Sequence, residues 1–544
     1  MDTRNKSGGN TRNMKEDNMY LRSKSGRNRM LLTLVPILLA VSLAVTGLVA
    51  AGCPAPVTVA PEPAAVAPTE GRQIITILHT NDLHGRIEPY FLLEDGRERG
   101  GLARIATVVN EIRQKEPNVI LVDAGDTIHG TMLSDLYEGK SMISVMNAMA
   151  YDVMVAGNHD FHWRGADTIL ARAAEATFPI ISANVIRRDT LSPLLPPFIF
   201  IDVGRVRIAF LGLTTRGTPG TVGHGLVADL EFLDPVEMAA LYVPYLKERA
   251  DLVIILAHIS GAEEDKIAKT VPGVDVIVHG HDHARRSKVV NDTLIVAAGC
   301  WGFHLGYLRL TVNKGRIVDY EKRLIPITAD IKEVPQIASL IEQYRRPFAN
   351  YIDEVVGYTA TDLIWGGWGV WIVARQQTNL GYLVTDAMRK AVRADIGLYT
   401  PWWIRDNMPA GYFRMCVIHA VLPFDWHKII LAALRGETIR TILEEAGVVL
   451  QAAGLTYKFD RGRPVGERVT ELLINGKPVE MDKIYTVAIG TYMWEAGLRK
   501  GLFQQEDLIK DTGILVRDAV ANHLREVRSV DLGVTEIEVL PKPW

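Results

Sequence analysis

The chain has 544 residues, of which 48% are hydrophobic and 23% are charged, and its formal net charge is −3 at pH 7. This composition is typical of a globular protein, and the length is sufficient for several domains. The small negative net charge excludes a strongly basic surface and therefore argues against binding to the phosphates of a nucleic-acid polymer.

Residues 1–52 are typical of an export leader. A basic, polar stretch through Arg29 precedes an uncharged apolar run from Leu31 to Ala51. The run ends in small residues before Cys53, which resembles the lipidation signal of bacterial lipoproteins and favours Cys53 as a lipid-carrying N-terminus. A run of about 21 apolar residues also fits a transmembrane anchor, and a cleaved signal peptide is a third interpretation. Each alternative places the rest of the chain on the outer face of the cytoplasmic membrane or in the periplasm.

The remaining sequence predicts two α/β regions. Residues 53–71 are rich in Pro and Ala and predict a tether. Strand-like apolar runs alternate with helix-like stretches across residues 72–330, and residues 200–212 predict a hairpin that turns at Gly204. A helical pattern over 331–351 predicts a linker helix, and a second α/β region occupies 352–544.

Polar residues directly follow five of the strand-like runs in the first region. The runs are 74–78, 119–122, 153–155, 252–256 and 274–278. The candidate ligands behind them are Asp82, His84, Asp126, Asn158, His258, His281 and His283. Because sites in open α/β sheets form at the carboxyl ends of the strands, we expect these side chains to converge. Carboxylate, imidazole and carboxamide ligands without a thiolate suit divalent metals.

The number of candidate ligands predicts a two-metal centre. Seven ligands are too many for one tetrahedral ion and suit two ions that share a bridging ligand. Asp126 has two oxygens and can serve as that bridge. These residues do not identify the metals, because Zn, Mn and Fe all accept histidine and carboxylate ligands.

The motifs resemble a known enzyme family. The segments HTNDLHGRIEP, DAGD, GNHDF, LAHIS and HGHDH are similar to those of the calcineurin-like metallophosphoesterase superfamily, and more narrowly to those of the secreted 5′-nucleotidase / 2′,3′-cyclic phosphodiesterase family. The later segments GLTYKFD and GERVTELLINGKPVEMDKIYTVAIG resemble the C-terminal domain of that family. The resemblance implies an N-terminal αββα metallophosphoesterase sandwich over 72–330, joined by the helix at 331–351 to a C-terminal α/β substrate-binding domain over 352–544.

The resemblance also implies roles for individual residues. One metal ion would be held by Asp82, His84, Asp126 and His283, and the other by Asp126, Asn158, His258 and His281. His159 matches the catalytic histidine of the family. The family usually has an aspartate three residues later, where this chain has His162. Since a neutral imidazole accepts a hydrogen bond but supplies no negative charge, we expect reduced or altered phosphatase activity.

In the second domain, some of the substrate-binding residues implied by the family are present and others are replaced. The matching residues are Arg375, Asn379, Arg405, Phe424 and Tyr492, the last two being the aromatic pair that stacks on a purine. Trp402 and Trp403 replace two glycines before Arg405, Trp426 replaces an asparagine, and Leu498 replaces the aspartate that holds ribose hydroxyls. These replacements argue against ordinary nucleoside recognition.

The leading hypothesis is a hydrolase of phosphoric esters that depends on two metal ions and acts on nucleotides or related phosphate esters. One alternative is a thiosulfohydrolase-like enzyme of sulfur oxidation within the same superfamily. A second alternative, from another class, is a non-catalytic ligand-binding lipoprotein. The expected partners are a small phosphate ester and the membrane that anchors the leader.

Overall fold

The computed structural model describes residues 71–93, 96–365, 376–532 and 538–540, all within the compact unit Glu62–Trp544. The predicted leader, Cys53 and Arg375 lie outside the described residues. Within the described part of the chain, every helix is too short or too polar to cross a membrane.

Two six-stranded sheets form the first half of the described chain. The first has the order β16-β15-β1-β4-β5-β6, with β1 (Arg72–Thr80), β4 (Val119–Asp123), β5 (Val153–Val155), β6 (Ile180–Ile181), β15 (His304–Asn313) and β16 (Arg316–Pro326). The second has the order β13-β14-β12-β11-β9-β8, with β8 (Phe198–Val203), β9 (Val206–Thr214), β11 (Leu252–His258), β12 (Val276–Gly280), β13 (Arg285–Val290) and β14 (Thr293–Ala298).

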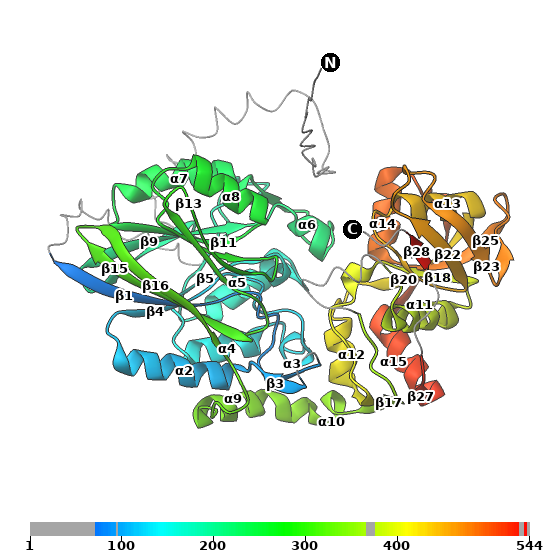
Figure 1. Ribbon diagram of the computed structural model, residues 1–544, viewed down its shortest axis with the longest axis horizontal. Coiled ribbons are helices and arrows are strands. Elements are labelled where there is room, and N and C mark those ends of the chain that lie inside the picture. The colour runs from blue at the N-terminus through cyan, green and yellow to red at the C-terminus, as the bar shows by residue number, and fades with distance from the viewer. Residues whose placement is uncertain (1–70, 94–95, 366–375, 533–537, 541–544) are drawn as a thin grey trace, which may run out of the picture. The chain divides into compact units, whose positions relative to one another are not determined.

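The sheets pack face to face and are covered by helices on their outer faces (Figure 1). Ile75 and Ile77 of the first sheet meet Ile254 and Leu256 of the second in one buried apolar cluster. The first sheet is covered by α2 (Leu102–Lys115), α4 (Lys140–Ala148) and α5 (Ala166–Glu175), and the second by α7 (Pro235–Lys247) and α8 (Gly261–Thr270). The predicted αββα sandwich is confirmed. The predicted hairpin is also confirmed, because β8 and β9 pair antiparallel about Gly204, whose φ is 61°.

Strand direction brings the predicted ligands to one edge of the sandwich. In the first sheet β1, β4 and β5 are parallel, and in the second β9, β11 and β12 are parallel. Asp82, Asp126 and Asn158 follow strands of the first sheet, whereas His258 ends β11 and His281 follows β12. Both sheets therefore present their carboxyl ends and the loops behind them to the same site.

A helical segment, α9 (Pro335–Arg345) and α10 (Ala349–Ile352), precedes a second α/β region that is built on a five-stranded sheet. That sheet has the order β21-β18-β25-β20-β26, with β18 (Ile396–Tyr399), β20 (Lys428–Arg435), β21 (Gln451–Ala453), β25 (Ile484–Gly490) and β26 (Leu508–Leu515). Its helices are α11 (Asn379–Val392), α12 (Met415–Val421), α13 (Gly436–Glu445), α14 (Thr491–Lys500) and α15 (Val516–Val527). Smaller sheets are formed by β17 (Val355–Thr359), β19 (Gly411–Arg414) and β27 (Ser529–Val530), and by β22 (Leu455–Asp460), β23 (Val469–Ile474), β24 (Lys477–Pro478) and β28 (Glu538–Leu540).

A buried histidine in β1 predicts a pH-dependent stability that is independent of the candidate ligands. His79 pairs with Gly306 of β15, and its ring lies so close to Gly306 that an added methyl group there would clash with it. Burial lowers the pKa of His79 to about 4. Because this folded-state pKa lies below the unfolded value of about 6.5, the stabilising contribution is complete above about pH 6.5 and is lost as the pH falls toward 4.

We expect the wild type to lose about 2 kcal/mol of unfolding free energy, relative to His79→Asn, between about pH 7.5 and about pH 5. Chemical denaturation of both proteins at the two pH values measures this difference. Histidines elsewhere in the chain affect both proteins alike, so equal pH dependence in the two would show that His79 does not titrate in this way.

Candidate metal centre

The first of two ligand groups consists of Asp82, His84 and His283. Each side chain offers one ligand atom, and these atoms lie within 4.8 Å of one another. The Nε2 atoms of His84 and His283 are 3.0 Å apart, and His283 Nε2 lies 3.5 Å from an oxygen of Asp82. All three side chains are buried, so their ligand atoms meet in a region that is shielded from solvent.

The second group consists of Asp126, His258 and His281, whose ligand atoms also lie within 4.8 Å of one another. His258 Nε2 is 3.1 Å from Asp126 Oδ2 and 3.1 Å from Asn158 Oδ1. Asn158 therefore joins this group through its carboxamide oxygen.

Asp126 connects the two groups. Its Oδ2 lies 3.1 Å from His258 of the second group and 3.7 Å from His84 of the first. The structure thus brings together all seven side chains that the sequence singled out as candidate ligands, with one carboxylate within reach of both groups.

The backbone at the ligands adopts conformations that are costly for residues other than glycine. Five of the seven candidate ligands have positive φ: Asp82 (52°), His84 (48°), Asp126 (54°), His281 (93°) and His283 (59°). Such conformations cluster at functional sites, where the surrounding structure holds them in place. Gly157 permits one close approach, because an added Cβ would clash with the backbone nitrogen of Asp126.

Asp160 holds the loops that carry Asp126 and Asn158, a role that the sequence did not reveal. Its carboxylate accepts four backbone N–H bonds, from Asp126 (3.1 Å), Thr127 (2.8 Å), Ile128 (3.0 Å) and Gly157 (2.8 Å). The sequence shows an aspartate inside the GNHDF motif, but only the fold shows that four backbone N–H groups bind its carboxylate.

The electrostatics of the groups fit a bound cation. Burial raises the pKa of Asp82 to about 7 and lowers the pKa of both His84 and His281 to about 3. Burial would also lower the pKa of His258, but the Asp126 carboxylate outweighs it and raises the value to about 10. His84 and His281 are therefore neutral at pH 7, whereas the buried Asp126 carboxylate favours a positive charge on His258, and a divalent cation bound to Asp126 supplies that charge in place of the proton.

His159 lies beside the ligand groups and contacts His162. The Nδ1 atom of His159 is 2.9 Å from Nε2 of His162, so the two rings share a hydrogen bond. The backbone N–H of His159 also donates to Asp126 Oδ1 at 2.7 Å, which ties the backbone of His159 to the carboxylate that connects the two ligand groups. The predicted pair of histidines is therefore assembled.

Behind His162 lies a carboxylate that the sequence did not reveal. Asp425 Oδ1 lies 3.9 Å from His162 Nδ1. Asp425 is more than 260 residues away along the chain, so no local pattern links the two. His129 stacks on His162 with ring centroids 3.7 Å apart, and it too was missed although it follows Asp126 by three residues.

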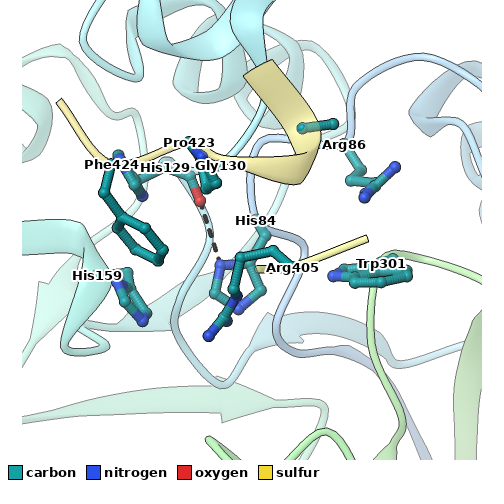
Figure 2. Close-up of a pocket in the computed structure, with 10 residues that line it drawn as sticks. His84, Arg86, His129, Gly130, His159, Trp301, Arg405, Pro423 and Phe424 are labelled. Carbon is teal, nitrogen blue, oxygen red and sulfur yellow. Dashed lines mark hydrogen bonds between the residues drawn. The ribbon is translucent and has the colours of Figure 1, made fainter. Parts of the chain in front are cut away.

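A pocket adjoins the ligand groups (Figure 2). Its lining residues are His84, Arg86, His129, Gly130, His159, Trp301, Arg405, Ala420, Pro423 and Phe424. Arg405 and Phe424 are substrate-binding residues predicted from sequence, whereas Arg86, His129 and Trp301 were missed. Burial lowers the pKa of Arg405 to about 10, so the side chain is still a cation at neutral pH.

Arg86 connects the pocket to a segment that lies far from it in sequence. Its guanidinium forms a buried ion pair with Asp406 and lies 3.9 Å from the ring centroid of Tyr90 and 4.2 Å from that of Trp301. The cation is thus held between aromatic faces and a carboxylate.

Two further predicted substrate residues, Asn379 and Tyr492, lie outside the pocket lining. The Asn379 oxygen accepts the backbone N–H of Ile364 at 2.7 Å, and its amide donates to the carbonyl of Asp362 at 3.0 Å, so this side chain organises its own neighbourhood. Tyr492 is half-buried and its ring contacts Trp403 at 5.0 Å.

Comparison with known proteins agrees with this architecture. Residues 75–285 match the calcineurin-like phosphoesterase family model, and residues 355–503 match the model of the 5′-nucleotidase C-terminal domain. The 5′-nucleotidase of Bos taurus is 30% identical over 525 residues, which cover 84% of this chain and 88% of the relative.

Solved structures give the same fold. The crystal structure of a 5′-nucleotidase precursor from Thermus thermophilus superposes with a TM-score of 0.77 at 27% identity, covering 87% of this chain and all of that chain. The sulfate thiohydrolase SoxB from Thermus thermophilus superposes with a TM-score of 0.73 at 19% identity, covering 86% of this chain and 97% of that chain, and shows a likeness of fold alone.

The two family models, the extent of the sequence similarity and the convergent histidine and aspartate groups lead to one conclusion. This chain belongs to the 5′-nucleotidase family and is a metal-dependent phosphoester hydrolase.

Proposed function

We propose that this enzyme hydrolyses phosphate monoesters, nucleotides among them, at a centre of two divalent cations. One cation would be held by Asp82, His84, Asp126 and His283, and the other by Asp126, Asn158, His258 and His281. The observation that carries the proposal is the position of Asp126, whose carboxylate lies within 3.7 Å of a histidine nitrogen in each ligand group. The donor types fit Zn, Mn or Fe.

The chain's own residues supply the remaining chemistry. Two divalent cations, when bound, would polarise the phosphoryl group and acidify the attacking water. Arg405 lines the pocket as a cation and neutralises charge on the phosphate oxygens. When both ring nitrogens of His159 carry protons, Nδ1–H donates to His162 Nε2 and Nε2–H passes its proton to the departing oxygen, which leaves the ring neutral.

His162 acts as a positioning residue for His159. Its Nδ1 faces Asp425 at 3.9 Å, so the negative charge that the aspartate of other family members provides directly is supplied here through a second imidazole. This arrangement supports retained hydrolytic activity despite the replacement at position 162.

We also propose that the enzyme works outside the cytoplasmic membrane. The sequence predicts a leader at 1–52, a tether at 53–71 and a lipid anchor at Cys53, and one similar solved structure is described as a precursor. The proposed organisation is a metallophosphoesterase domain over 72–330, a linker helix over 331–351 and a substrate-binding domain over 352–544. Salvage of phosphate or nucleosides is the corresponding role.

Metal removal provides the test of the proposed function. After chelation and gel filtration, turnover of p-nitrophenyl phosphate and of AMP is expected to fall at least about a hundredfold and to return when Mn²⁺ or Zn²⁺ is added. Metal analysis should find two ions per chain in the restored enzyme. Sulfate release from a sulfur carrier without phosphate release from any ester would contradict the proposal, as would turnover that persists without metal.

A further inference from the structure

The pocket beside the metal groups contains two large aromatic side chains, Phe424 and Trp301. A nucleobase is held in such pockets by stacking on an accessible aromatic face. Whether either ring has such a face decides which leaving groups the pocket accommodates.

Phe424 is only 3% exposed and is surrounded by other rings. His129, His159 and His162 have ring centroids 5.8, 5.8 and 5.9 Å from it. Trp403 and His427 have ring centroids 4.6 and 5.5 Å from it. With histidines and an indole packed around it, Phe424 offers no accessible face to an incoming base.

Trp301 is occupied as well. The guanidinium of Arg86 lies 4.2 Å from its ring centroid, and Tyr90, His283 and Phe303 contact the ring from other directions. Its exposed fraction is 8%. Stacking a base on Trp301 would require removal of an arginine that forms a buried ion pair with Asp406.

Trp403 is the centre of the aromatic cluster behind Phe424. Its ring centroid lies 4.6 Å from Phe424, 5.0 Å from Tyr492, 5.5 Å from Trp426 and 4.2 Å from His427. The indole is 7% exposed. The Trp403 indole therefore fills the space beside Phe424 and Tyr492 that the planar ring of a ligand would need.

The helix that carries Tyr492 has a leucine at position 498, where the family resemblance implied a ribose-binding aspartate. Leu498, six residues after Tyr492 in α14, packs against the buried cluster that contains Trp494 and Phe503, whereas Tyr492 packs against the cluster that contains Phe424 and Trp403. A leucine there offers no hydrogen bond to a hydroxyl group.

We propose that Trp403 closes the base-binding space of this enzyme, and that it selects its substrates as phosphate monoesters without recognising a nucleobase. This inference rests on the proposed function and narrows its substrate class. Phosphate binds between the metal groups and Arg405, and the leaving alcohol contacts the short wall formed by Ala420, Pro423 and Phe424.

AMP and ribose 5-phosphate provide a matched test, since they share the reacting phosphate and the pentose and differ in the base. In the wild-type, metal-loaded full chain, kcat/KM for AMP is expected to be within about threefold of that for ribose 5-phosphate. In Trp403→Ala the ratio of AMP to ribose 5-phosphate is expected to rise about tenfold, because the opened space allows one base to stack on Phe424 or Tyr492. The control is Trp402→Ala, whose side chain is 39% exposed and which should leave the ratio unchanged.

Calorimetry with adenosine gives a readout that does not depend on hydrolysis. Wild type is expected to bind adenosine with a Kd weaker than about 1 mM, and Trp403→Ala about tenfold more tightly. A wild-type preference for AMP above tenfold, or tight adenosine binding that Trp403→Ala abolishes, would overturn the proposal by making Trp403 itself the stacking surface. If Trp403→Ala does not fold, the wild-type ratio of kcat/KM for AMP to that for ribose 5-phosphate and the wild-type Kd for adenosine still test the proposal. If the wild type hydrolyses none of these esters, the proposed function fails, whereas adenosine binding still tests the closed space.

Discussion

Replacing Asp126 with asparagine is expected to lower kcat/KM for phosphate monoesters at least about a thousandfold. The carboxylate reaches both ligand groups through Oδ2 and accepts the backbone N–H of His159 through Oδ1. A carboxamide keeps the shape but removes the charge and one of the two acceptor oxygens. Both metal positions and the placement of His159 are therefore disturbed together.

Steady-state kinetics and metal analysis of the purified Asp126→Asn variant measure this effect. We expect fewer than two ions per chain together with the loss of rate. Asp319→Asn, at an exposed position in β16, is the matched control and should behave as wild type. An Asp126→Asn enzyme with two tightly bound ions and near-normal rates would refute the role of this carboxylate as the shared ligand.

Replacing His159 with alanine is expected to lower kcat by about 10²- to 10⁴-fold while both metal ions remain bound. His159 lies outside both metal groups of the proposal but lines the pocket and holds His162 at 2.9 Å. If the ring protonates the leaving oxygen, the loss should be largest for alkyl esters, whose alcohols are poor leaving groups. It should be smaller for p-nitrophenyl phosphate, whose leaving group departs without a proton.

The comparison of ester classes separates proton donation from a general loss of structure. His79→Asn, which replaces a buried histidine outside the pocket, is the control and should retain both activities at neutral pH. An equal loss for alkyl and p-nitrophenyl esters in His159→Ala would argue that the ring binds the phosphate and does not donate a proton.

The sequence predicted the metal groups because their geometry follows from strand direction. Residues behind neighbouring parallel strands meet at one sheet edge, so Asp82 and Asp126 could be placed together from the sequence. His258 ends a strand of the second sheet, and its position beside them depends on how the two sheets pack. The alternation of apolar runs and helix-like stretches predicted a layered α/β fold, whereas the αββα sandwich itself was implied by the family resemblance.

Contacts between distant segments could not be predicted in this way. Asp425 lies behind His162, and Asp406 pairs with Arg86, only because the second α/β region folds against these positions. Trp403 was recognised as a replacement for a glycine, but its contacts with Phe424 and Tyr492 depend on side-chain packing that no periodicity records. Asn379 matched a motif and yet hydrogen-bonds to its own neighbourhood.

The left-handed backbone at five of the ligands has a consequence for how the enzyme acquires its ions. Hydrogen bonds within the protein hold part of this backbone: the N–H of Asp82 donates to the carbonyl of Gly125, the N–H of His84 to the carbonyl of Asp126, and the N–H of Asp126 to Asp160. We therefore expect the chain to fold without its ions. Zinc fingers, by contrast, are unfolded until metal arrives. An apoprotein of this kind can mature after folding and exchange one divalent ion for another, so that supply in its surroundings decides which metal it carries.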